Sequence, residues 1–77
     1  MKNITEHRNE VMKSLFAIVK DKGYSQQELA AEIDLKQANL SRMKNGKYSP
    51  NLDNILKICE VLGLTIKFEP NEQRINH

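Results

Sequence analysis

The sequence predicts a small all-α domain, a bundle of four to five short helices followed by one short β-strand. The chain has 77 residues, which suffices for a single domain with a small hydrophobic core. Apolar residues recur at helical spacing through most of its length, and glycines, prolines and helix-capping residues divide it into short segments. We therefore expect one domain over residues 1–77, with a helical core over 4–64, a strand over 65–69 and a tail over 70–77.

The composition limits the classes of function. The only cysteine, Cys59, cannot form a disulfide within the chain or a cysteine-rich zinc site, and His7 and His77 share no metal-binding spacing with it. We therefore expect neither a metal nor a cofactor. Ser25 and Ser49 are placed at a cap and a turn with no histidine beside them, so the chain is not expected to be an enzyme. Because the start is too polar for a signal peptide and no apolar run approaches the ~20 residues of a membrane span, we expect a cytoplasmic protein with no membrane contact.

The first helix is expected over about residues 5–22. Asn3 and Glu6 have the spacing of a capping box at its start, and Gly23 is placed to end it. Its apolar residues recur every three to four positions, which is typical of a helix with one buried face. They are Ile4, Val11, Met12, Leu15, Phe16, Ile18 and Val19.

A second, shorter helix is expected over about residues 26–33. Ser25 and Glu28 form a capping box, in which the serine oxygen accepts from a first-turn amide and the glutamate bonds back to the serine. Tyr24 and Leu29 have the spacing of a hydrophobic staple across this start.

The third helix is expected over residues 37–45, after a tight break at 34–36. It has only Leu40 and Met43 as strong inward anchors, and Gly46 is placed for a left-handed cap at its end. The other side chains of this helix are polar or small, and none is acidic. The helix therefore presents a polar, basic surface to solvent.

A fourth helix is expected to begin after the cap residue Asn51 and to stop at Gly63. Residues 65–69 then alternate apolar and polar side chains, which is the period of a strand, and Pro70 ends that segment. The apolar stripe of the fourth helix consists of Leu52, Ile55, Leu56, Ile58, Cys59 and Leu62.

Positive charge is concentrated in one stretch of the chain. Residues 36–48 carry four bases and no acid, a net charge of +4, whereas the other 64 residues carry eight bases and ten acids, a net charge of −2. The four bases are Lys36, Arg42, Lys44 and Lys47. A local basic stripe indicates a polyanionic partner that binds one surface, although a solvated lysine-rich face explains the charge alone equally well.

Two short helices joined by a three-residue break, the second of them thinly anchored and polar outside, describe a helix-turn-helix. The major groove of DNA, about 12 Å wide, admits one helix, whose side chains donate to and accept from base edges. Glutamine and asparagine match adenine and arginine matches guanine, so Gln37, Asn39 and Arg42 carry suitable chemistry on a suitable element.

Residues 24–64 resemble the Cro/CI-type helix-turn-helix domain, the lambda-repressor-like XRE family. The resemblance is carried by Ser-Gln-Gln-Glu-Leu-Ala at 25–30, Leu-Ser-Arg at 40–42, Asn-Gly-Lys-Tyr-Ser-Pro at 45–50 and the apolar helix from 52 to Leu-Gly-Leu at 62–64. It implies a DNA-binding fold, usually dimeric, that acts on operator DNA.

The resemblance also implies roles for individual residues. Gln26 would bond a phosphate or brace the first recognition side chain, Gln37 would contact adenine, and Ala38 would touch only a thymine methyl group. Arg42 would reach either a base or a phosphate, and Asn39 would either face the DNA or bond locally. The implied DNA-binding set is Gln26, Lys36, Gln37, Ala38, Asn39, Ser41, Arg42, Lys44, Asn45 and Lys47.

Three departures from the family pattern stand out. Asp34 occupies the turn position that commonly holds glycine, and Lys36 replaces the usual serine or threonine cap of the recognition helix. The third departure is that the extended segment 65–69 stands where the family has a short fifth helix, which resembles the antitoxin-type members. Because a lone edge strand needs a partner, we expect a homodimer built on Leu64, Ile66 and Phe68.

These expectations lead to three hypotheses for the function. The main hypothesis is a sequence-specific transcriptional regulator that binds double-stranded DNA as a dimeric repressor, with helix 37–45 in the major groove. The alternative is the antitoxin of a toxin–antitoxin pair, which binds a toxin protein and regulates its own operon. A third hypothesis is a domain that retains the helix-turn-helix shape and binds only protein.

Overall fold

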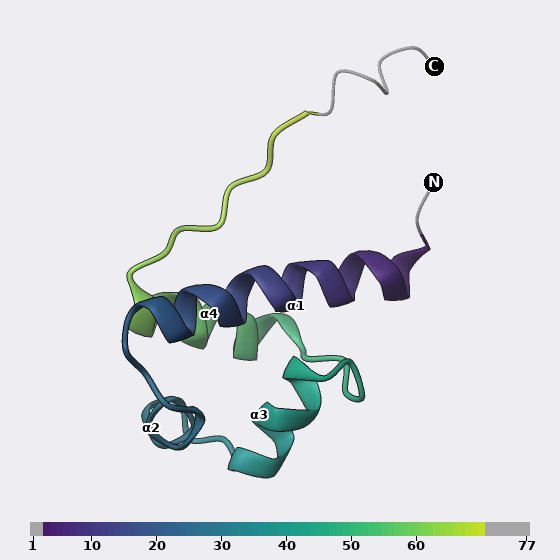
Figure 1. Ribbon diagram of the computed structural model, residues 1–77. Coiled ribbons are helices and arrows are strands. Elements are labelled where there is room, and N and C mark those ends of the chain that lie inside the picture. The colour runs from purple at the N-terminus through teal and green to yellow at the C-terminus, as the bar shows by residue number, and fades with distance from the viewer. Residues whose placement is uncertain (1–2, 71–77) are drawn as a thin grey trace.

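A computed structural model describes residues 3–70 of the chain. Within that range it forms four helices and no strand, in the order α1 (Ile4–Asp21), α2 (Gln26–Glu32), α3 (Gln37–Lys44) and α4 (Leu52–Leu62). Figure 1 shows α1 lying across one side of the bundle, with α2 and α3 beneath it. The predicted all-α class is confirmed, and each predicted helix is present within about one residue of its expected bounds.

Side-chain caps define where three of the helices begin. At the start of α1, Asn3 Oδ1 accepts from the amide of Glu6 at 2.8 Å, and the Glu6 carboxylate accepts from the Asn3 amide at 3.2 Å. The same reciprocal pair forms between Ser25 and Glu28 at 3.0 and 2.9 Å. Asn51 Oδ1 caps α4 at 2.8 Å. Each cap satisfies an amide that has no partner within the helix, which confirms all three predicted starts.

Each of the four helices described is followed by a residue with positive φ, which reverses the chain. Three of these residues are glycines, and the fourth is Asp34 after α2, with φ 56°. The next amide along the chain then bonds back into the last turn, as at Leu35 to the Ala30 carbonyl, 3.0 Å. This pattern is the Schellman motif, and it lets the chain turn sharply enough to pack such short helices together.

The core consists of side chains from all four helices. Leu29 of α2, Leu40 and Met43 of α3, and Ile58 of α4 are fully buried. They are surrounded by Met12, Leu15, Phe16, Val19, Ala30, Ile33 and Leu62. The helix α3 packs against both α1 and α2, and α2 also packs against α4. The two buried residues of α3, Leu40 and Met43, therefore attach one side of this helix to the core and leave its other side exposed.

The predicted apolar stripes of α1 and α4 are wider than the faces these helices bury. Val11, Leu52 and Leu56 were expected on the inner faces, but 48%, 64% and 47% of their surfaces are exposed. Ile4, at the start of α1, is 79% exposed. Ile4 lies in the first turn of α1, before the residues that contact the loop at Gly46. Val11 borders an open hollow beside the buried Met12, and Leu52 and Leu56, one turn apart, share an exposed edge of α4.

After Gly63 the chain leaves the bundle. Figure 1 shows residues 64–70 running away from the helices as an extended segment, and the described residues 3–70 contain no strand with which it could pair. Leu64 packs partly against the core, whereas Phe68 is 94% exposed. The strand over 65–69 and its role in dimerisation therefore stay predictions, and the tail expected over 70–77 lies outside the described residues from position 71 onward.

Candidate nucleic-acid interface

Helix α3 has one fully buried side and one open side. Leu40 and Met43 are completely buried against α1 and α2. The exposed residues of α3 and its C-cap are Gln37, Ala38, Arg42, Lys44 and Asn45, and Asn39 and Ser41 are half-buried. This open side contains no acidic residue. The structure therefore brings the predicted recognition residues together on one accessible helix face.

The start of α3 is open and positively charged. Lys36 is its N-cap residue, and the lysine side chain makes no capping hydrogen bond. The first turn contains no acidic residue. The side-chain cap is absent as expected, because a lysine has no acceptor to offer the first-turn amides. The positive end of the helix dipole and the Lys36 charge both favour an anion at this position.

The turn between α2 and α3 depends on Asp34. Its φ of 56° lies in the left-handed region that favours glycine. Aspartate adopts this conformation more readily than most other residues, because its short polar side chain can bond locally. The turn therefore keeps the tight geometry of a helix-turn-helix without the usual glycine.

One polar pair links two residues of the recognition face. The Arg42 guanidinium donates from Nη1 to Asn39 Oδ1 over 3.5 Å, a long hydrogen bond between exposed side chains. Asn39 thus makes the local bond that was the alternative to direct DNA contact. The bond uses one of the five N–H donors of the exposed Arg42 side chain, which leaves four.

The loop after α3 rests on α1, a contact that sequence reasoning missed. Arg8 Nη2 donates to the Gly46 carbonyl at 3.4 Å. A Cβ atom at Gly46 would lie 2.8 Å from Asn9 Oδ1, so the backbone passes closely over that side chain. Both α1 residues precede Gly46 by more than 35 positions, and no sequence motif connects them. This contact fixes the loop that carries Asn45 and Lys47.

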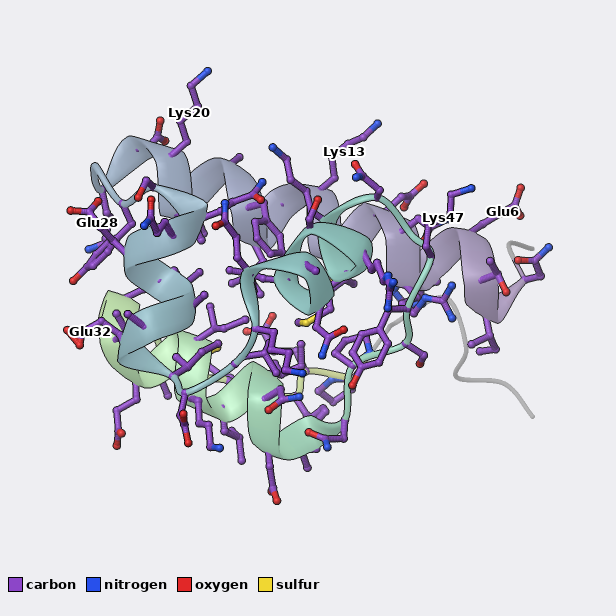
Figure 2. All side chains as sticks on the ribbon, turned by 90° about the horizontal axis from the view of Figure 1, so that it is seen from below. Glu6, Lys13, Lys20, Glu28, Glu32 and Lys47 are labelled. Carbon is purple, nitrogen blue, oxygen red and sulfur yellow. The ribbon has the colours of Figure 1, made fainter. Side chains whose placement is uncertain are left out.

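The acidic residues of α2 lie away from this face. Figure 2 shows Glu28 and Glu32 projecting from the side of α2 opposite α3, while Lys47 lies on the loop at the other end of the molecule. Gln26, at the start of α2, is half-buried. The basic stretch predicted from the sequence, residues 36–48, therefore lies on α3 and the loop after it, apart from Glu28 and Glu32.

The described residues contain no exposed cysteine, no metal-binding cluster and no membrane-spanning helix. Cys59 is buried, and burial raises the pKa of its thiol, as expected for an inert core cysteine. Among residues 3–70, no three His, Cys, Asp or Glu side chains are grouped to hold a metal ion. Nor does any helix in that range have the length and apolar character needed to cross a membrane.

The fold and the open basic helix define a protein of the helix-turn-helix class. A family model described as helix-turn-helix matches residues 15–68, from within α1 to the extended segment after α4. The chain belongs to this family, the XRE-type helix-turn-helix proteins, whose shared domain is a DNA-binding regulatory domain. The resemblance noted in the sequence is thereby confirmed.

Two solved structures show the same arrangement. One is titled "MDT Protein" and the other "Structure of HipA-HipB-O2-O3 complex". Each matched chain is 25% identical to this one with a TM-score of 0.73, and the match covers 82% of this chain and 89% of the other. A comparison with curated protein sequences finds no match. The likeness therefore extends beyond the helix-turn-helix itself to most of the domain.

Proposed function

We propose that this protein is a sequence-specific DNA-binding regulator that represses transcription by occupying operator DNA. The observation that carries this proposal is the two-sided character of α3. Its two large apolar residues are fully buried, while its open side is polar, basic and free of acids. A helix presented in this way fits the major groove, where polar side chains meet base edges and acids would be repelled by phosphates.

Individual roles follow from position. Gln37 and Ala38, in the first turn of α3, would contact bases: the amide suits adenine and the methyl group suits thymine. Arg42 would reach a base or a phosphate one turn later, with Asn39 and Ser41 beside it. Phosphate contacts would come from residues at the edges of the face, namely Gln26, Lys36, Lys44, Asn45 and Lys47.

We propose a homodimer paired through residues 65–69. Phe68 is 94% exposed and Ile66 is 39% exposed on a segment that extends from the bundle without a partner strand. Pairing two such strands across a two-fold axis would satisfy their edges and bury both side chains. Leu64 would contribute less, because it already packs partly against its own core. The dimer would place two α3 helices in successive major grooves.

The second candidate function is an antitoxin that also binds a partner protein. One similar chain comes from a structure whose title names a HipA-HipB complex, so a protein of this shape takes part in an assembly with other components. The exposed apolar side chains of Ile4, Leu52 and Phe68 offer surface for a second protein. A neighbouring gene whose product is toxic alone, and binds this protein when both are produced, would support this candidate.

The deciding experiment is selection of bound sites from random duplex DNA, followed by a salt titration on the recovered site. We expect an inverted repeat, because a two-fold dimer reads two equivalent half-sites. If each protomer neutralises about three to four phosphates, log K should fall with log salt at a slope of about −5 to −7. Binding without salt dependence, or no enriched sequence, would contradict the proposal and leave the protein-only alternative.

A further inference from the structure

A basic hollow lies between α1 and the end of α3. It has a volume of about 360 Å³ and is lined by Lys13, Phe16, Ala17, Lys20, Lys44 and Asn45. Three of these residues carry an ammonium group and none carries a carboxylate. Two of the three lysines come from α1, which sequence reasoning did not assign to the DNA-binding surface.

The two α1 lysines share one side of their helix. Lys13 and Lys20 are seven residues apart, which is close to two full turns, so their side chains leave α1 about 10 Å apart in nearly the same direction. Figure 2 shows both of them projecting from the same edge of α1. Lys44, in the last turn of α3, faces the hollow from its other wall.

The helix dipole explains the positions of two of the three lysines but not of the third. Lys20 and Lys44 lie in the last turns of their helices, where a cation is favourable. Lys13 lies in the middle of α1, where it lines both this hollow and a neighbouring one that Glu10 also borders. None of the three lysines forms an ion pair with another residue between positions 3 and 70. Three cations that line one hollow, with no acid in its lining, favour a bound anion there.

The hollow is continuous with the proposed DNA-binding face. Lys44 and Asn45 belong to both, because they line the hollow and also stand at the end of the open side of α3. DNA with α3 in its major groove presents a sugar–phosphate strand along each flank of that helix. The flank on which Lys44 lies is the flank beside α1, so the strand on that side would pass the hollow.

We propose that Lys13 and Lys20, together with Lys44, bind backbone phosphates of the same DNA that α3 reads, which extends the interface onto α1. This inference rests on the proposed function. Because lysines contact phosphates as point charges, these residues would add affinity for every DNA sequence and would not select among bases.

The test uses the full chain with Lys13→Gln and Lys20→Gln, singly and together, and the duplex recovered by site selection. Lys57→Gln is the matched control, since Lys57 is an exposed lysine of α4 outside the hollow. Each lost phosphate contact should reduce the magnitude of the salt slope by about 0.9, so the double variant should lose about 1.8 per protomer. Affinity for the selected and unrelated duplexes should fall by the same factor, and Lys13→Arg with Lys20→Arg should restore it.

Other outcomes distinguish failure of this inference from failure of the proposed function. If the wild-type protein shows a salt-dependent slope and the double variant keeps it, this inference is wrong while the proposed function stands. The same conclusion applies if the double variant loses binding to a partner protein but not to DNA. If the wild-type protein itself shows no salt-dependent DNA binding, both the inference and the proposed function fail. Equal effects of Lys57→Gln and Lys20→Gln would also overturn the inference, because a general charge effect would then explain the loss.

Discussion

The Arg8 guanidinium donates to the carbonyl oxygen of Gly46, 3.4 Å away, and so ties the second turn of α1 to the loop that follows the recognition helix. Arg8 Nε in the same side chain is buried without a hydrogen-bond partner. A buried N–H without a partner costs free energy. The hydrogen bond to Gly46 offsets that cost and keeps the Arg8 side chain in place. The position of Lys47, one residue after Gly46, therefore depends on a residue that lies 39 positions earlier.

Removing this tie should loosen the loop. Arg8→Met keeps most of the apolar stem and removes both the donor to Gly46 and the unpaired Nε. We expect the free energy of unfolding to fall by about 1 kcal/mol, because the lost tie to the loop outweighs the relief at Nε. Affinity for DNA should also fall, with no change in the preferred sequence, because the loop contributes phosphate contacts. Urea unfolding and a binding titration measure the two effects. Arg8→Lys separates charge from geometry, and unchanged stability in Arg8→Met would show that the contact contributes nothing.

The turn residue Asp34 should be replaceable with a gain in stability. With φ at 56°, an L-residue is strained, whereas glycine adopts this conformation freely. Asp34→Gly should therefore raise the free energy of unfolding by about 1 kcal/mol, seen as a higher urea midpoint at an unchanged slope. Asp34→Ala should lower it, because alanine adopts this left-handed conformation less readily than aspartate. Destabilisation by glycine would mean that the carboxylate makes a contact worth more than the strain.

The buried thiol of Cys59 gives a pH signature. Burial raises its pKa, so the folded state holds it neutral at a pH where the unfolded chain ionises it. The unfolded state is then favoured as the pH rises above about 8.5, the ordinary thiol value. Relative to Cys59→Ala, the wild-type protein should lose stability between pH 7 and pH 9.5 in the presence of a reductant. Parallel pH profiles for the two proteins would contradict this prediction.

The exposed phenylalanine tests the dimer. Phe68→Glu places a charge at the proposed strand pair, and we expect a monomer at micromolar concentration, where the wild-type protein should sediment as a dimer. Binding to a duplex with two half-sites should weaken far more than binding to a single half-site, since only the former gains from two linked subunits. A wild-type monomer at that concentration, or a dimeric Phe68→Glu variant, would rule out the strand as the interface.

Local signals in the sequence predicted most of the fold. The paired caps at Asn3 and Ser25 and the glycines after the helices are short-range chemistry, so they fix helix bounds without knowledge of packing. The buried anchors Leu40 and Met43 followed from spacing alone. The width of the buried faces did not, because Val11 has helical spacing but borders an open hollow at the edge of the face that buries Met12.

The part of the candidate site that lies on α3 was predicted, whereas the part that lies on α1 was not. Residues of α3 share one element, so periodicity placed Gln37 and Arg42 on a common exposed face. The contributions of α1 depend on how two helices pack against each other. Neither the support of Gly46 by Arg8 nor the proximity of Lys20 to Lys44 has a signature in a single sequence.

The most direct test of the central claim, that the open face of α3 reads DNA sequence, is site selection from random duplexes with the wild-type protein and with Gln37→Ala in parallel. We expect the wild-type protein to enrich an inverted repeat. Gln37→Ala should lose preference at one position of each half-site, at a cost of about 1–3 kcal/mol on the original sequence. Identical enriched sequences from both proteins, at equal affinity, would show that this face of α3 does not contact the bases.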